Sequence, residues 1–113
     1  MILDKADGTR TMIRAYLDLQ RGDSLAGLRV AAALAIVDQA AALRLTRAEL
    51  AAVLGLNGTT NLSHLMMGRL NKYSVEWLLR AAQKVGARLE YSFSPDPNRT
   101  ETLRQWRVAQ LDR

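Results

Sequence analysis

The sequence predicts a mainly α-helical fold with one short β-strand near its C-terminal end. Two short apolar-patterned runs, residues 47–54 and about 60–67, are joined by a tight turn that contains glycine. An alanine-rich segment, residues 25–43, has a strong helix-forming composition. Residues 88–93 alternate polar and apolar side chains, which is the period of a strand. With 113 residues, the chain suits a single domain with one core.

The first short run is bounded by helix signals at both ends. Thr46 precedes the run and Glu49 follows three residues later, which is the spacing of a capping box. Gly55 supplies the left-handed position at which a helix ends, so a helix is predicted from Arg47 to Leu54. We expect its apolar residues Leu50, Val53 and Leu54 to face the core, and Leu56 to pack into the core across the turn.

The second short run follows almost at once and stops at Gly68. Its helix should begin at about Thr59 or Thr60 and end at Met67, with Leu62, Leu65 and Met66 turned inward. Polar side chains would then occupy its outer face: Thr59, Thr60, Asn61, Ser63 and His64. Two short helices joined by a tight turn form a helix-turn-helix, whose second helix can lie in the major groove of DNA.

Further helices are predicted on both sides of this unit. Residues 1–8 are polar and should be loosely held, and residues 11–20 should form a short amphipathic helix with Met12, Ile13, Tyr16 and Leu17 on one stripe. Ser24 is the expected N-cap of the helix over 25–43, whose small residues permit close packing on several sides. Ser74 should cap a helix over 75–85, which Gly86 ends.

The C-terminal part combines the predicted strand with a last helix. The strand would place Leu89, Tyr91 and Phe93 on one face and pair with residues 1–3 or with its own copy across a two-fold axis. Asn98, with Glu101 at the capping-box position, should start a helix over 99–111 whose apolar stripe is ragged. The chain is thus divided into an N-terminal extension of residues 1–23, a helix-turn-helix domain of residues 24–94 and a basic tail of residues 95–113.

The composition favours a soluble cytoplasmic protein with a polyanionic partner. Sixteen Lys and Arg residues against eleven Asp and Glu residues give a net charge of +5, which suits phosphate neutralisation. Many basic proteins never bind nucleic acid, so the charge alone decides little. Without cysteine the chain has neither a disulfide framework nor a thiolate metal site. We expect no membrane span. We also expect no metal, no cofactor and no enzymatic activity, because His64 is the only histidine and no nucleophile elbow or phosphate-loop motif is present.

The segment from Leu45 to Phe93 resembles the Cro/repressor-type (XRE) helix-turn-helix family, in particular its antitoxin-like and phage-type regulators. The residues that carry the resemblance are Leu45-Thr46-Arg47-Ala48-Glu49-Leu50-Ala51-Ala52-Val53-Leu54-Gly55, Gly68-Arg69, Tyr73-Ser74-Val75-Glu76-Trp77-Leu78-Leu79, Val85-Gly86 and Leu89-Glu90-Tyr91. It implies a lambda-repressor-like helical domain. The family's usual Gln is replaced here by Arg47, and the stretch between Gly55 and Leu62 is one residue longer than the pattern.

Within this interpretation the second helix reads base edges and nearby polar or basic residues hold phosphates. The expected base-reading residues are Thr59, Thr60, Asn61, Ser63 and His64, since Asn can bond adenine and a Thr methyl can meet a thymine methyl. The expected phosphate contacts are Arg47, Asn57, Arg69 and Lys72, and Arg44 is a weaker candidate that would otherwise cap the preceding helix. The alternative interpretation of both sets is an ordinary solvated surface.

The sequence therefore predicts sequence-specific binding of double-stranded DNA by a homodimeric transcriptional regulator. Two copies of the second helix would enter successive major grooves about 34 Å apart. An antitoxin that neutralises a protein toxin and autoregulates its operon is the alternative, with residues 1–43 and 94–113 as toxin-binding surfaces. A third hypothesis is a helix-turn-helix used only for protein interaction. RNA polymerase is a further possible partner, and repression and activation are equally compatible with the sequence.

Overall fold

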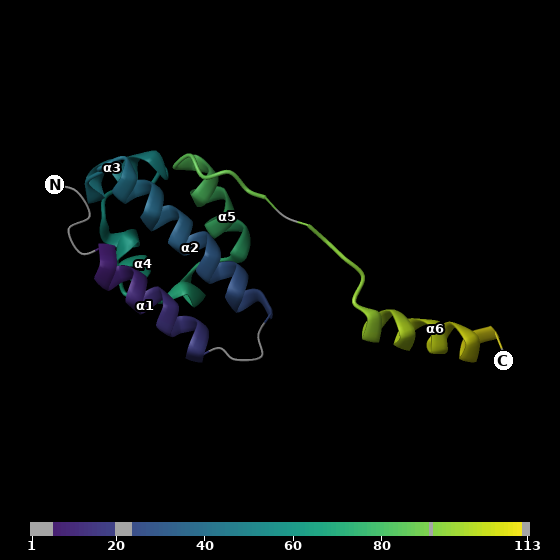
Figure 1. The fold of residues 1–113 in the computed structure, drawn as a ribbon. Coiled ribbons are helices and arrows are strands. Elements are labelled where there is room, and N and C mark those ends of the chain that lie inside the picture. Colours follow the sequence, from purple (N-terminus) through teal and green to yellow (C-terminus); the bar gives the residue numbers. More distant parts are fainter. Residues whose placement is uncertain (1–5, 20–23, 91, 112–113) are drawn as a thin grey trace.

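The computed structural model describes residues 6–19, 24–90 and 92–111, apart from the side chains of Ser24 and Thr60. The elements of this part are α1 (Ala6–Leu19), α2 (Ser24–Ala42), α3 (Arg47–Val53), η1 (Thr60–Leu62), α4 (Ser63–Met66), η2 (Leu70–Lys72), α5 (Val75–Lys84) and α6 (Pro97–Leu111). The first seven form a helical domain, and α6 lies away from it at the end of an extended segment (Figure 1). The mainly helical class that the sequence predicted is confirmed.

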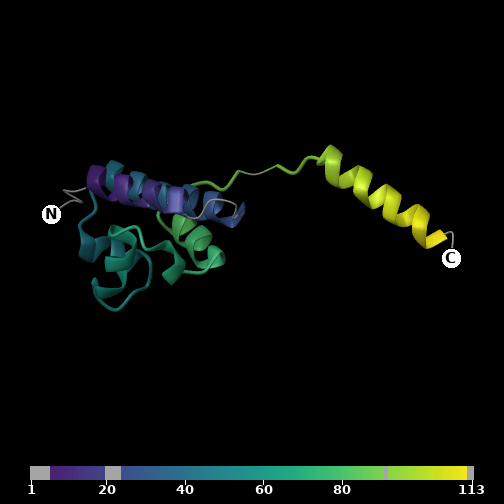
Figure 2. The ribbon, with the colours of Figure 1, turned by 90° about the horizontal axis from the view of Figure 1, so that it is seen from below.

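Helix α2 lies at the centre of the domain. Figure 2 shows α1 and α2 side by side in one layer, with the helix-turn-helix and α5 in a second layer beneath them. The buried residues of α2 are Ala26, Val30, Ala32, Ala33, Ile36, Val37 and Ala40. Because most of them are small or β-branched, neighbouring helices approach α2 closely, as its composition predicted. The helix begins at Ser24 itself, so its N-cap lies outside the described residues.

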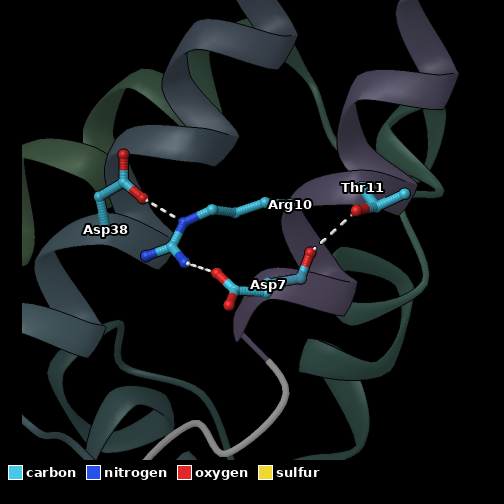
Figure 3. Close-up of polar contacts among 4 residues, drawn as sticks. All are labelled: Asp7, Arg10, Thr11 and Asp38. Atoms are coloured by element: carbon cyan, nitrogen blue, oxygen red, sulfur yellow. Dashed lines mark hydrogen bonds and ion pairs between the residues drawn. The ribbon is translucent and has the colours of Figure 1, made fainter.

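Helix α1 is attached to α2 by an arginine between two carboxylates. Arg10 Nε donates a 2.6 Å hydrogen bond to Asp38 on α2, and its Nη1 lies 2.7 Å from Asp7 on its own helix (Figure 3). The Thr11 hydroxyl donates to the Asp7 carbonyl at 3.0 Å. The hydrogen bond to Asp38 is the largest of the causes that raise the pKa of Arg10 above its ordinary value.

The predicted bounds and stripe of α1 need correction. The helix begins at Ala6, so residues 6–8 are helical and not loose. Ile13 and Tyr16 are buried as expected, but Met12 and Leu17 are more than two-fifths exposed. The predicted stripe was too wide, because α1 lies over α2 and α4 along one narrow face.

The same helix also contacts the helix-turn-helix. The hydroxyl of buried Thr9 donates to the Met66 sulfur at 3.7 Å. Gly68 has a φ of +70° and lies so close to the Met12 carbonyl that a Cβ would overlap it. Glycine is therefore required here for two independent reasons, its backbone conformation and its contact with α1. Helix α1 thus shares one core with the helix-turn-helix.

The segment after α5 differs from its prediction. No strand is assigned to residues 88–90 or 92–93, and Tyr91 and residues 1–3, the proposed intramolecular partner, lie outside the described residues. The C-terminal strand therefore stays unconfirmed.

The last helix begins earlier than expected and has a different cap. Asp96 Oδ1 accepts hydrogen bonds from the backbone N–H groups of Asn98 at 3.0 Å and Arg99 at 3.3 Å. The expected cap Asn98 is inside α6, and Glu101 pairs with Arg104 at 3.5 Å. Pro97 explains the shift, because proline favours the first helical position and Asp96 then precedes it as the N-cap.

Within the described residues, one helix is apolar and long enough to cross a membrane by length and composition, over Leu25–Ala42. This span belongs to α2, whose core face packs against α1 and α5. Burial in the core accounts for part of its apolar composition, since 39% of the span is buried inside the structure.

Candidate nucleic-acid interface

Helix α3 begins with a complete capping box. The Thr46 hydroxyl accepts from the Glu49 N–H, and the Glu49 carboxylate accepts from the Thr46 N–H, both at 3.0 Å. The hydrogen bond from the Thr46 backbone is the largest cause that lowers the pKa of Glu49 below its ordinary value of 4.5. The predicted start of this helix is therefore confirmed at the level of its hydrogen bonds.

The inward face of α3 is narrower than its sequence indicated. Leu50, Ala51 and Leu54 are buried, whereas Val53 is 41% exposed, so the expectation that Val53 faces the core is wrong. At 100° per residue, buried Leu54 and Ala51 lie about 40° and 100° from Leu50 in one direction around the helix, whereas Val53 lies about 60° away in the other. Val53 falls on the solvent side.

The turn after α3 is closed by backbone hydrogen bonds. Gly55 has a φ of +74°, and the Leu56 N–H donates to the Ala51 carbonyl at 2.8 Å. This six-to-one bond is the Schellman arrangement that the position of Gly55 predicted. Leu56 is half-buried and packs against the core, as expected. The turn thus fixes where the chain enters the second helix.

The second helix is shorter and tighter than predicted. A 3₁₀ turn over Thr60–Leu62 leads directly into α4, which ends at Met66, so the helical segment has seven residues. The N-cap of α4 is Leu62, which makes no side-chain capping hydrogen bond. The Leu62 N–H donates to the Thr59 carbonyl at 3.0 Å. Leu62, Leu65 and Met66 are buried, as the sequence predicted.

Tyr73 braces this short helix from behind, a role that the sequence analysis missed. Its hydroxyl donates to the Asn61 carbonyl at 2.6 Å and accepts from the Leu65 N–H at 3.0 Å. Its ring stacks on Trp77 with centroids 4.6 Å apart, and burial raises the pKa of its phenol. A hydroxyl that bonds two turns of one segment fixes the segment's orientation as well as its end.

An arginine from the core helix holds the Tyr73 backbone in turn. Arg29 Nη1, on α2, donates to the Tyr73 carbonyl at 2.6 Å and lies 3.5 Å from the Leu70 carbonyl. The arginine thereby gives the Tyr73 carbonyl at the C-cap of η2 a side-chain partner, and it approaches the Leu70 carbonyl, which already accepts from the Tyr73 N–H at 3.1 Å. The orientation of the second helix consequently depends on α2 through Arg29 and Tyr73. A tyrosine seven residues after the end of a short helix is the only sequence signal for this brace.

The predicted base-reading residues differ in their surroundings. Thr59, Asn61 and Ser63 are exposed, and the side chain of Thr60 lies outside the described residues. His64 is half-buried with its ring edge-on to Tyr73 at 6.5 Å, and its Nδ1 is buried without a hydrogen-bond partner in the described part of the chain. The second helix therefore presents short polar side chains to solvent at its first turn.

The predicted phosphate contacts flank this helix in the chain. Arg47, Asn57, Arg69 and Lys72 are all exposed, at the start of α3, in the turn, and just after α4. Arg44 is also exposed and has a φ of +55°, the left-handed conformation that glycine usually supplies at a helix C-terminus. The Leu45 N–H bonds the Ala40 carbonyl at 2.9 Å, which completes the C-terminal cap of α2 around this arginine.

No group of three or more His, Cys, Asp or Glu side chains that could hold a metal ion occurs in the described ranges. The available chemistry of the interface is hydrogen bonding and positive charge.

Comparison with protein-family models identifies a helix-turn-helix domain over residues 15–94. The chain belongs to this helix-turn-helix domain family. The matched range covers α2 to α5 and the last turn of α1, so the recognised unit includes the bracing residues Arg29 and Tyr73. Comparison with curated proteins and with solved structures finds no match. Membership of the helix-turn-helix domain family supports DNA as the partner of this surface.

Proposed function

We propose that this helix-turn-helix protein is a homodimeric, cytoplasmic transcriptional regulator of the XRE type that binds specific sequences of double-stranded DNA, without catalysis or cofactor. The observation that carries the proposal is the division of the second helix into two faces. Leu62, Leu65 and Met66 are buried, while Asn61 and Ser63 are exposed at the first turn. A helix that is anchored on one face and polar at its N-terminal turn suits insertion into the major groove.

In this proposal Asn61 is the principal base-reading residue. It is exposed, and its backbone carbonyl is held by Tyr73 at 2.6 Å, so the position of its Cα is fixed before DNA arrives. An amide side chain can bond adenine N6 and N7 together. Thr59, Thr60 and Ser63 contribute neighbouring contacts, and His64 lies at the edge of the contact surface.

Arg47, Asn57, Arg69 and Lys72 serve as phosphate contacts, and Arg44 joins them. A non-glycine residue in the left-handed conformation is under strain, and strained residues concentrate at functional sites. Arg44→Gly should therefore stabilise the fold by up to about 1 kcal/mol while it weakens binding to every duplex. Urea unfolding and a binding titration measure the two effects. Unchanged DNA affinity would limit Arg44 to capping α2.

The test is selection of bound duplexes from a random pool at two salt concentrations, repeated with matched variants. Asn61→Ala should reduce the preference for the selected site over other sequences by about 1–3 kcal/mol. Arg69→Ala should weaken all duplexes alike and lower the salt slope by about one unit. Arg104→Ala, which removes the same charge from α6, is the control. If the wild-type protein enriches no sequence, the proposed function is wrong.

A second candidate is an antitoxin that binds a protein toxin and controls its own operon. It is favoured by the apolar side chains that α1 leaves exposed: Met12 and Leu17 are more than two-fifths exposed, and Leu19 is 81% exposed. Co-expression with the product of an adjacent gene should then yield a stable complex. Leu17→Glu should abolish that complex and leave DNA binding unchanged. If Leu17→Glu keeps both the complex and DNA binding, this surface is not the toxin-binding site.

A further inference from the structure

Helix α6 is a folded element whose apolar side chains remain in solvent. None of its 15 residues is buried, and Trp106 is 60% and Leu111 75% exposed. An isolated helix of this length is only marginally stable in water, so most helices are held by packing. At 100° per residue, Leu103, Trp106 and Leu111 fall within about 140° of the helix circumference, a sector that they share with Arg107 and Gln110. The exposed face of α6 therefore combines large apolar side chains with an arginine, and both kinds of residue are enriched at protein interfaces. This face has the composition of a contact surface.

The helical domain carries a groove of matching character. It lies between α2, α5 and the start of the extended segment, has a volume of about 210 Å³, and is lined mainly by apolar residues: Leu28, Ala31, Ala35, Leu79, Ala82 and Leu89. Pockets for drug-sized ligands usually have about 300–1,000 Å³. The groove is therefore better suited to one or two large side chains of a helix than to a small-molecule effector.

The segment between groove and helix directs α6 outward. Ala87 and Leu89 form part of the groove's lining, so the segment starts at the groove and then extends away from the domain (Figure 1). It contains no glycine from residue 87 to 96, and Pro95 and Pro97 favour extended backbone for the residues before them. At about 3.3 Å per residue, a linker of nine residues can span up to about 30 Å. A segment that leaves the groove in this direction places α6 where it can bind another molecule more readily than it can pack on its own domain.

The surface area of the chain supports a second copy as that molecule. The accessible surface is 8116 Å², about 1,900 Å² more than the roughly 6,200 Å² of a compact monomer of this mass. Stable protein interfaces bury about 1,200–2,000 Å² in total. If two chains exchange their α6 helices across a two-fold axis, each chain has an excess accessible surface of this order that the interface can bury.

We propose that two copies of the chain exchange their α6 helices, with Leu103 and Trp106 of each seated in the groove between α2 and α5 of the other and Leu111 beside it. This inference rests on the proposed function, which includes a homodimer, and it identifies the interface of that dimer. Figure 2 shows α3 and α4 in the layer opposite α1 and α2, so the exchange leaves the second helix of the helix-turn-helix open to DNA.

The first test measures oligomeric state without DNA. Size-exclusion chromatography with light scattering should give twice the 12.6 kDa chain mass for the wild type. Leu103→Glu and Trp106→Glu should raise the dimer dissociation constant about tenfold or more, because each places a charge in an apolar contact. Gln105→Glu adds the same charge outside the apolar face and should leave the dimer unchanged. A monomeric wild type, or equal effects of all three variants, would overturn the exchange.

The second test distinguishes exchange from folding back, and uses the absence of native cysteine. Ala31→Cys protein, mixed with Leu103→Cys protein, should form a disulfide-linked dimer on oxidation. Ala52→Cys, on the exposed surface of α3, replaces Ala31→Cys in the control and should not cross-link to Leu103→Cys. An intrachain disulfide in the Ala31→Cys/Leu103→Cys double variant, without the trans product, would show that α6 folds back and would overturn the proposal.

Failure of the exchange and failure of the proposed function give different results. Leu103→Glu should lose affinity for a paired site and keep wild-type affinity for a single half-site. If the wild type binds no duplex selectively but still exchanges α6, the interface stands and the regulatory function does not. If it binds selectively while Leu103→Glu remains dimeric, the function stands and the exchange is wrong.

Discussion

Helices α5 and α6 begin in the same way and end in different surroundings. Ser74 caps α5 by accepting from the Trp77 N–H at 3.0 Å, and Asp96 caps α6 by accepting from Asn98 at the same distance. Each helix carries one tryptophan. Trp77 stacks on Tyr73 with ring centroids 4.6 Å apart, whereas Trp106 is 60% exposed.

The difference between them lies in apolar spacing. The inward residues of α5 recur at three- and four-residue intervals, as Leu78, Ala81, Ala82 and Val85, and all are buried. The apolar residues of α6 are separated by arginines, and Val108 falls outside the face formed by the others. Local capping is therefore sufficient to start a helix, but a continuous stripe is what binds it to a core. Each prediction below tests one part of this contrast.

Truncation of a core leucine should separate the two helices most strongly. Leu78 is fully buried, so Leu78→Ala should lower the free energy of unfolding by about 2–5 kcal/mol. Val108→Ala removes an exposed side chain of α6 and should change the free energy of unfolding by less than about 0.5 kcal/mol. Urea unfolding measures both. Similar losses would show that α6 is part of the same cooperative core.

Glycine substitutions should reveal how closely the elements of the domain approach one another. Gly58→Ala meets open space and is penalised only by its φ of +85°, whereas Gly68→Ala combines a φ of +70° with overlap at the Met12 carbonyl. Gly68→Ala should therefore cost about 1–3 kcal/mol more in unfolding free energy than Gly58→Ala. Equal costs in urea unfolding would mean that α1 moves aside without penalty.

Removal of the Tyr73 hydroxyl should loosen the second helix of the helix-turn-helix. Tyr73→Phe keeps the ring that stacks on Trp77 but loses the bonds to Asn61 and Leu65. A loss of about 1–2 kcal/mol in unfolding free energy is expected, together with faster amide exchange at Leu65. Unaltered exchange there would mean that apolar burial alone holds the segment.

Removal of the two caps should produce effects in different places. Ser74→Ala should lower the unfolding free energy of the domain by about 1 kcal/mol, because α5 belongs to its core. At a protein concentration at which the chain is monomeric, Asp96→Ala should increase amide exchange within α6 and leave exchange in α2 and α5 unchanged. Amide exchange resolved by segment distinguishes the two outcomes. A response of α2 to Asp96→Ala would link α6 to the packing of the domain.

The smallest expected effect is the pH dependence of the capping box on α3. The pKa of Glu49 is lowered in the folded protein, so its contribution to stability is present above its ordinary value of 4.5 and is lost as the pH falls through the lowered pKa. Glu49→Gln preserves a cap but cannot titrate, and should remove this part of the acid dependence. Unfolding curves between pH 3 and pH 6 measure it. An identical pH profile for both proteins would contradict the assignment.

Much of the helix-turn-helix could be predicted because its signals are local. The capping box at Thr46 and Glu49 and the glycine turn at Gly55 depend on residues within five positions of one another. The candidate base-reading set followed from these bounds, and Thr59, Asn61 and Ser63 are exposed as that set requires. Their role in DNA recognition stays a prediction.

The remaining features depend on contacts between residues far apart in sequence. Val53 was assigned to the wrong face because a seven-residue helix has too few apolar positions to fix its orientation. The brace through Tyr73 depends on Arg29, 44 residues earlier, and no periodicity indicates such a pair. The cap of α6 is a local exception: Pro97 takes the first helical position, so Asp96 and not Asn98 is the N-cap.

The sequence by itself determined where most helices of this protein begin and end, and that a helix-turn-helix is present. These features follow from backbone hydrogen bonds and side-chain spacing, which act over one or two helical turns. The tertiary structure alone decided that α1 covers the helix-turn-helix, that Tyr73 holds the second helix, and that α6 stands apart from the core. Such arrangements depend on the packing of surfaces that the chain brings together only when it folds.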